Sequence, residues 1–384
     1  IATIALNNPN AVTTSGTYYI KVVTTAGCED IKAVTVTVNP KPNLVITNPI
    51  AVCAPSSVDL TAAAVTAGST LYGGILSYWT DAGATSALAN PNAVIVSGTY
   101  YIKVVTSAGC EDIKPVTVTV NPKPNLVITN PAAVCAPSSV DLTAAAVTAG
   151  STLYGGILSY WTDAGATSAL ANPNAVIVSG TYYIKVVTSA GCEDIKPVTV
   201  TVNPKPNLVI TNPAAVCAPS SVDLTAANVT AGSTLLDGTL SYWTDVIATI
   251  PLANPNAVTA SGTYYIKVVT TAGCEDIKPV TVTVNPKPNL VITNPIAVCA
   301  PSSVDLTAAA VTAGSTLYGG ILSYWTDAGA TSALANPNAV IVSGTYYIKV
   351  VTSAGCEDIK PVTVTVNPKP NLVITNPAAV CAPS

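Results

Sequence analysis

Short runs of alternating apolar and polar residues recur along the whole chain, and turn residues separate them. Between residues 42 and 123, Val116–Val120 alternates strictly, so one face of this strand is expected to pack and the other to meet solvent. No stretch shows a helical period. The pattern predicts about seven short strands with Gly, Pro, Asn and Ser turns between them. The clearest are Leu44–Thr47, Ser57–Thr61, Leu76–Thr80, Ala93–Val96, Thr99–Val105 and Val116–Val120.

The whole pattern repeats every 82 residues. Three sets of residues recur at this interval. One cysteine set is Cys28, Cys110, Cys192, Cys274 and Cys356, and the other is Cys53, Cys135, Cys217, Cys299 and Cys381. The tryptophan set is Trp79, Trp161, Trp243 and Trp325. A unit of this length exceeds the repeat of a solenoid, which needs its neighbours to fold, and matches a small autonomous β-domain. We therefore predict an all-β chain of tandem antiparallel Ig-like β-sandwich domains in an elongated rod.

A proline-rich motif, Asn-Pro-Lys-Pro-Asn, marks the expected boundaries between domains. Its two prolines fix φ twice and favour extended neighbours, so it predicts a short, stiff linker. The linker residues are Pro40, Lys41, Pro42, Pro122, Lys123, Pro124, Pro204, Lys205, Pro206, Pro286, Lys287 and Pro288. The predicted domains are a partial repeat at 1–41, full repeats at 42–123, 124–205, 206–287 and 288–369, and the start of another at 370–384. Ile1 falls inside a strand-rich repeat, so we expect a segment of a longer protein.

The ten cysteines predict disulfides and an oxidising, extracellular setting. Zinc is disfavoured because the chain has no histidine and no CxxC motif. If the stiff linker separates Cys110 from Cys135, the partner of Cys110 is Cys53 in the same repeat. By repetition, the intradomain scheme pairs Cys53 with Cys110, Cys135 with Cys192, Cys217 with Cys274, and Cys299 with Cys356, and leaves Cys28 and Cys381 with partners outside the segment.

A second pairing stays open. It joins Cys28 to Cys53 and Cys110 to Cys135, and it uses all ten cysteines, which stand almost symmetrically about the linker lysine. The intradomain scheme also meets an objection. Cys53 lies just before the second strand and Cys110 just after the next-to-last one. The two share one pole of a sandwich only if an even number of strands separates those turns, or if the first strand is broken.

Composition excludes several classes of function. The net charge is −4, only 9% of residues are charged, and every basic residue is a lysine, which argues against a nucleic-acid partner. No run of 18 apolar residues predicts insertion into a membrane. Without histidine, Ser-His-Asp and Cys-His catalysis are not available. The sequence predicts no enzyme, no cofactor and no metal site.

Three features have a functional and a structural interpretation. The Glu111-Asp112 pair could form a weak calcium site, but a solvated hairpin tip is favoured because no further acidic ligands accompany it. Trp79 could stack on a sugar, but we expect it to fill the core between the two sheets. Alternation predicts that one ring of Tyr100-Tyr101 points inward and the other outward beside Lys103.

Several motifs resemble the Ig-like repeats of giant Bacteroidota surface proteins, including flavobacterial gliding adhesins. They are Val52–Thr61, Tyr78–Asp81, Gly98–Tyr101, Ala108–Cys110 and Val116–Pro122. The resemblance implies a structural stalk of a secreted cell-surface filament that supports gliding motility and attachment, exported by the type IX system. Its partners would be adjacent repeats, surface polysaccharide or substratum, and the gliding or secretion machinery. Alternatively, the repeats themselves bind glycans by avidity, or serve as spacers in a surface enzyme or S-layer protein.

Overall fold

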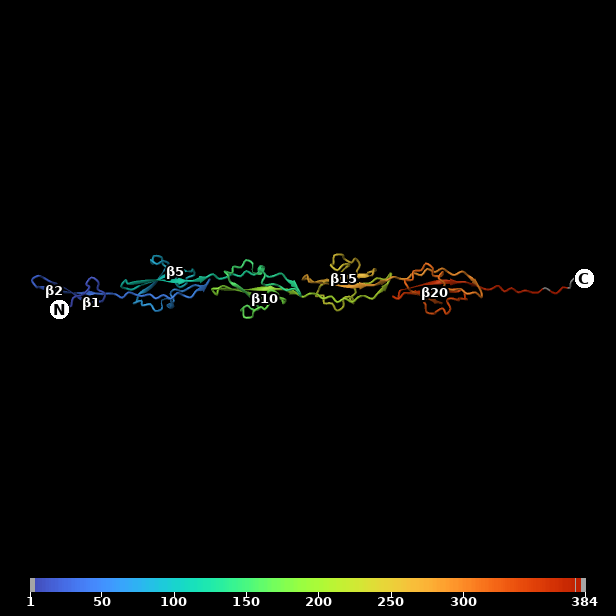
Figure 1. Cartoon of the computed structure of the whole chain (residues 1–384), viewed down its shortest axis with the longest axis horizontal. Coiled ribbons are helices and arrows are strands. Elements are labelled where there is room, and N and C mark those ends of the chain that lie inside the picture. The colour runs from blue at the N-terminus through green and yellow to red at the C-terminus, as the bar shows by residue number, and fades with distance from the viewer. Residues whose placement is uncertain (1–3, 377, 381–384) are drawn as a thin grey trace. The chain divides into compact units, whose positions relative to one another are not determined.

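The computed structural model describes residues 4–376 and 378–380, and it contains two compact units. The first comprises residues 1–134 and 138–202, and the second comprises residues 135–137 and 203–384. The first unit begins with a hairpin of β1 (Gly16–Val23) and β2 (Glu29–Val36). The same ribbon pattern then recurs around the strands labelled β5, β10, β15 and β20 (Figure 1).

One layer of each sandwich is a three-stranded antiparallel sheet. In the first full repeat its strands are β4 (Ile75–Trp79), β5 (Gly98–Val105) and β6 (Glu111–Val118), with β5 in the centre. The opposite layer has shorter pairings. There β3 (Val52–Cys53) runs parallel to β7 (Val120–Asn121), and a 3₁₀ turn, η1 (Ala63–Thr66), follows β3. Isolated bridges Val58↔Val94 and Asn43↔Thr70 complete this layer.

The other three repeats copy these elements. The second has β8 (Val134–Cys135), η2 (Ala145–Thr148), β9 (Ile157–Trp161), β10 (Gly180–Val187), β11 (Glu193–Val200) and β12 (Val202–Asn203). The third has β13 (Val216–Cys217), β14 (Thr239–Trp243), β15 (Gly262–Val269), β16 (Glu275–Val282) and β17 (Val284–Asn285). The fourth has β18 (Val298–Cys299), β19 (Ile321–Trp325), β20 (Gly344–Val351), β21 (Glu357–Val364) and β22 (Val366–Asn367).

A compact apolar core lies between the two layers of each sandwich. Alternate residues of β5 and β6 face inward, and the opposite layer supplies Val58, Leu60 and Val94. All of these side chains are at most 4% exposed. Burying each one contributes about 1.5–3 kcal/mol, so the inward-facing residues of both layers hold the sandwich together. The same cluster recurs in the other three repeats.

The expected fold class, tandem all-β sandwiches with an 82-residue period, is confirmed. The strand at Thr99–Val105 is found as predicted, whereas Leu44–Thr47 is extended chain without a regular strand. Its backbone instead makes scattered hydrogen bonds, such as that from the Thr47 N–H to the Val65 carbonyl at 2.9 Å. The division at the Pro-Lys-Pro segments stays a prediction.

A tight glycine in each repeat offers a test of the packing. A Cβ on Gly74 would lie 2.6 Å from Val104 Cγ2 and 2.9 Å from the Leu71 carbonyl oxygen. A Cβ on Gly98 meets nothing closer than 3.7 Å. We expect alanine at Gly74, Gly156, Gly238 and Gly320 together to lower the free energy of unfolding of each repeat by about 1–3 kcal/mol, because the added methyl overpacks the site.

The matched control places alanine at Gly98, Gly180, Gly262 and Gly344, where the added Cβ would make only ordinary van der Waals contact, at 3.7–3.8 Å from a tyrosine ring. Urea denaturation followed by tryptophan fluorescence should show a lower midpoint for the first set and an unchanged midpoint for the control. Equal shifts in both sets would mean that the close approach of Gly74 to β5 does not limit packing.

Candidate functional site

The two cysteines of a repeat lie at opposite poles of its sandwich. Cys53 is on β3, which pairs with β7, the strand from which the chain leaves the repeat. Cys110 ends the tight turn between β5 and β6 at the other end of the sheet. Its sulfur lies 3.8 Å from the carbonyl oxygen of Asn39, which precedes the repeat. Cys53 therefore marks the C-terminal pole and Cys110 the N-terminal pole.

The structure joins cysteines of neighbouring repeats. The disulfides are Cys53–Cys192, Cys135–Cys274 and Cys217–Cys356, each with a sequence separation of 139 residues. Each one links the C-terminal pole of a repeat to the N-terminal pole of the next. Both open schemes are therefore corrected, because Cys53 pairs neither with Cys110 nor with Cys28, and Cys135 pairs neither with Cys192 nor with Cys110.

Distance explains why the intradomain pairing fails. The eight residues of β5 separate the two poles, and at about 3.4 Å per residue they span about 27 Å. A disulfide needs Cα atoms within about 7 Å. In the observed bonds the Cα atoms are 5.5 to 5.6 Å apart. Cys53 and Cys110 do not share a pole of the sandwich, so the condition that the intradomain pairing requires is not met.

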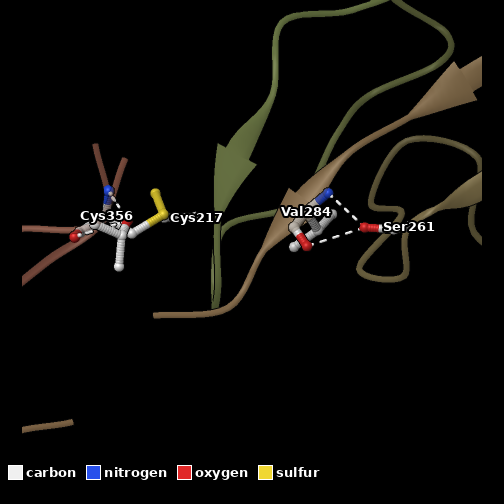
Figure 2. The surroundings of a disulfide bond; sticks show 5 residues. Cys217, Ser261, Val284 and Cys356 are labelled. Atoms are coloured by element: carbon white, nitrogen blue, oxygen red, sulfur yellow. Dashed lines mark hydrogen bonds between the residues drawn. A yellow bond between two sulfur atoms is a disulfide. The ribbon is translucent and has the colours of Figure 1, made fainter. Parts of the chain in front are cut away.

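The strand pair β13–β17 positions Cys217, the first cysteine of the Cys217–Cys356 bond. The Val216 N–H donates to the Thr283 carbonyl at 3.0 Å and the Ala218 N–H to the Asn285 carbonyl at 2.9 Å, so both sides of Cys217 are anchored. Figure 2 shows how Ser261 holds the partner strand. Its Oγ donates to the Val284 carbonyl at 2.9 Å and accepts from the Val284 N–H at 2.8 Å.

A closed turn positions the second cysteine. The Thr352 N–H donates to the Cys356 carbonyl at 2.9 Å, and the Cys356 N–H donates to Thr352 Oγ1 at 3.0 Å. Gly355 takes a φ of +79°, which a left-handed turn position requires and glycine adopts freely. The bonded cysteines in this turn, Cys192, Cys274 and Cys356, are each 1% exposed. The turn thus presents its sulfur in one fixed direction.

In each repeat, an aspartate two residues after the turn cysteine binds the backbone of the chain that enters the repeat from the linker. Asp194 Oδ2 accepts a hydrogen bond from the Leu126 N–H at 2.9 Å, immediately after the linker, and Asp112, Asp276 and Asp358 do the same in their repeats. A hydrogen bond to a charged, nearly buried group contributes about 1.5–3 kcal/mol. The aspartate of the Glu-Asp pair is therefore not part of a solvated tip, which corrects that expectation, whereas its glutamate is exposed. Its glutamate pairs with a strand lysine, as in Lys103–Glu111 at 2.6 Å.

The linker lysines add a weaker contact. Lys123 Nζ lies 4.0 Å from Asp194 Oδ1, and Lys205 Nζ lies 3.6 Å from Asp276 Oδ1. Both lysine side chains are about half exposed. Such pairs contribute at most about 1 kcal/mol, so the backbone hydrogen bond to the aspartate dominates. We call the disulfide, the linker and this aspartate together the inter-repeat junction.

Three cysteines are unpaired among the described residues: Cys28, Cys110 and Cys299. The spacing of 139 residues accounts for them. The position 139 residues before Cys28 or Cys110, and the position 139 residues after Cys299, both lie outside the 384 positions of the sequence. Cys381, which the sequence expectation leaves with an outside partner, lies beyond the described residues.

Trp79 does not fill the core, which corrects the expectation. Leu76 and Tyr78 pack on the core cluster, so Ser77 and Trp79 point to the outer face of the sheet. There the Trp79 Nε1–H donates to Ser77 Oγ at 2.9 Å, and Tyr101 lies opposite it on β5. The split of the tyrosine pair is confirmed, because Tyr100 packs inward.

The remaining acidic residues serve the turns. The Ser86 N–H donates to Asp81 at 2.7 Å and lowers the pKa of that carboxyl, and the Thr61 hydroxyl likewise lowers the pKa of Asp59. A general acid needs a raised pKa instead. Within residues 4–376 and 378–380, no group of three or more acidic or cysteine side chains is arranged to hold a metal ion. No helix in the same residues is long and apolar enough to span a membrane.

The geometry defines a class of protein: tandem β-sandwich domains with covalent links between neighbours. No protein-family model and no curated protein matches the sequence. Among solved structures, the chain is similar to the N-terminal eight Ig domains of DSCAM, with 10% identity, a TM-score of 0.40, and 92% of this chain covered. It spans about half of that fragment, 53%.

Two further structures illustrate the same likeness. The insect immune protein hemolin has 12% identity and a TM-score of 0.22, covering 85% of this chain and 100% of its own. An I-band fragment of titin has 10% identity and a TM-score of 0.31, covering 71% of this chain and 94% of its own.

The disulfide pairing can be tested by freeing one cysteine at a time. Cleavage before aspartates releases residues 245–275 as a peptide that contains Cys274 and differs in sequence from its copies. We expect Cys135→Ala to make this peptide reactive toward a thiol label, because Cys135 is the partner of Cys274. Mass spectrometry of the labelled, non-reduced protein gives the result.

Cys217→Ala is the matched control, since it removes a cysteine from the same position of the next repeat. It should leave the 245–275 peptide unlabelled, because it frees Cys356 instead. The intradomain scheme predicts the reverse result for the two variants, and that reversal would overturn the observed pairing.

Proposed function

We propose that this chain is a structural stalk segment of a secreted bacterial cell-surface adhesin filament. The observation that carries the proposal is the inter-repeat junction, where neighbouring repeats are joined both by the peptide linker and by a disulfide. Two connections between the same pair of sandwiches restrict their separation. A protein that holds a binding tip away from a cell needs that restriction, whereas a catalytic domain does not.

The resemblance to Bacteroidota adhesin repeats supports the finer proposal. Among these proteins the motifs are most similar to those of the flavobacterial gliding adhesin SprB, which suggests export by the type IX system and a role in gliding and attachment. Disulfide-bonded domains are also consistent with an extracellular location. The proposed partners are adjacent repeats, surface polysaccharide or substratum, and the gliding or secretion machinery at other parts of the protein.

One observation favours a second candidate, in which the repeats themselves bind glycans. The outer face of each sheet carries a tryptophan and a tyrosine side by side, Trp79 and Tyr101 in the first full repeat. Aromatic rings on a sheet face can stack on sugars, and four weak sites on one chain would bind by avidity.

A binding assay separates the two candidates. The 384-residue chain is applied to glass and to immobilised polysaccharide, beside a variant with alanine at Trp79, Trp161, Trp243 and Trp325. A stalk should bind neither surface above background, and the variant should behave like the parent. Binding by the parent that is lost in the variant would contradict the stalk and support the glycan-binding repeat.

Immunogold electron microscopy of the producing cells tests the location. Antibodies against this chain should label thin filaments along their length outside the cell. Label confined to the cell interior, or to globular particles without filaments, would contradict the proposal.

A further inference from the structure

The three disulfides create a covalent route that is far shorter than the sequence. Cys53 connects directly to Cys192, and Cys217 connects directly to Cys356. Only the segment from Cys192 to Cys217, a difference of 25 positions, lies between these two bonds. Cys53 and Cys356 are 303 positions apart in sequence, yet this route joins them through 25 residue steps and two disulfides.

The segment Cys192–Cys217 contains few residues that could be pulled straight, as its copy Cys274–Cys299 inside the second unit shows. From Cys274 to Cys299 the chain consists of β16, β17, the linker, an extended stretch and β18, without a helix or hairpin. The segment Cys274–Cys299 runs through the third repeat from its N-terminal pole to its C-terminal pole. It then runs through the fourth repeat, again from the N-terminal to the C-terminal pole. The crossing of the fourth repeat runs from Leu290, bound to Asp358, to Cys299, paired with β22.

Lengths show that this crossing is close to fully extended. The nine steps from Leu290 to Cys299 reach at most about 30–32 Å. The eight-residue strand β20 of the same sandwich spans about 27 Å. The segment Cys192–Cys217 has the same strands at the same positions, β11, β12 and β13, and differs only by Ala214 in place of Ile296.

We infer that these disulfides and the 25-step segments between them form one continuous covalent connection, which we call the cable. Under load the cable carries the tension, and it prevents the chain from becoming longer when repeats unfold. Because this route is covalent, unfolding of the repeats cannot lengthen it beyond the 25 steps between Cys192 and Cys217. The remaining bond, Cys135–Cys274, belongs to a second cable of the same construction, offset by one repeat. The connectivity is a property of the chain, and only its use under load rests on the proposed stalk function.

Single-molecule stretching of the 384-residue chain between residues 1 and 384 tests the cable. Unpaired thiols are first alkylated, and the force is set to unfold repeats without breaking disulfides. The oxidised path comprises 52 steps up to Cys53, 25 steps between Cys192 and Cys217, and 28 steps after Cys356, which is 105 in total. At 3.3–3.6 Å per residue its limit is about 350–380 Å.

Reduction should open the path to all 383 steps of the sequence, so the limiting length should rise about 3.6-fold, to about 1,260–1,380 Å. An oxidised chain that reaches the reduced length would overturn the inference. The limiting length does not depend on whether the repeats stay folded during stretching, because at high force it is set only by the covalent connections. It is also independent of the surface-binding assay, so the stalk function and the cable can fail separately.

Two substitutions provide a matched comparison. Cys135→Ala removes a disulfide that the shortest path does not use, so the oxidised length should stay unchanged. Cys217→Ala breaks that path, and the next shortest runs through Cys53, Cys192, Cys135 and Cys274 with 52, 57 and 110 steps, or 219 in total. The expected increase is about twofold. Equal lengths for the two variants, or a longer chain with Cys135→Ala, would overturn the cable.

Discussion

The opposite placement of the two cysteines in each sandwich is the constraint on which the covalent architecture depends. An eight-residue central strand separates the poles by several times the reach of a disulfide, so each cysteine can bond only beyond its own repeat. The late cysteine therefore meets the early cysteine of the repeat before it. Because the strands run from one pole to the other, the disulfide joins two neighbouring domains and does not cross-link a single one.

Polar contacts at the junction serve the same geometry. Ser261 holds the strand beside Cys217, Thr352 closes the turn that presents Cys356, and Asp358 captures the chain just after the linker. These contacts all join a short side chain to backbone groups, so each one fixes the local course of the chain. The cysteines are consequently held in bonding distance by the sandwiches themselves, without a dedicated binding pocket.

Repetition with little variation fits a mechanical role. The strands, the turn at the N-terminal pole and the linker are nearly unchanged between repeats, and the differences gather in the loops of the third repeat, such as Leu236-Asp237 and Val246-Ile247. A uniform unit suits the proposed role, because each junction repeats the disulfide and the aspartate hydrogen bond of its neighbours. The outer aromatic pair is also kept in each repeat, and the proposed stalk function gives no reason for it.

The sequence by itself determined the repeat, the all-β class and the main strands of the sheet, because strict alternation over Val116–Val120 leaves one apolar face to bury and β-branched and aromatic residues dominate Thr99–Val105. It did not reveal the short pairings of the opposite layer, where the alternating stretch Ser57–Thr61 forms only the single bridge Val58↔Val94. Nor did it reveal the outward face of Trp79, which depends on strand register. The partners of the cysteines were decided only by the tertiary structure. Spacing along a chain counts residues, whereas a disulfide requires two sulfur atoms at the same pole, and which pole each occupies follows from the direction of its strand.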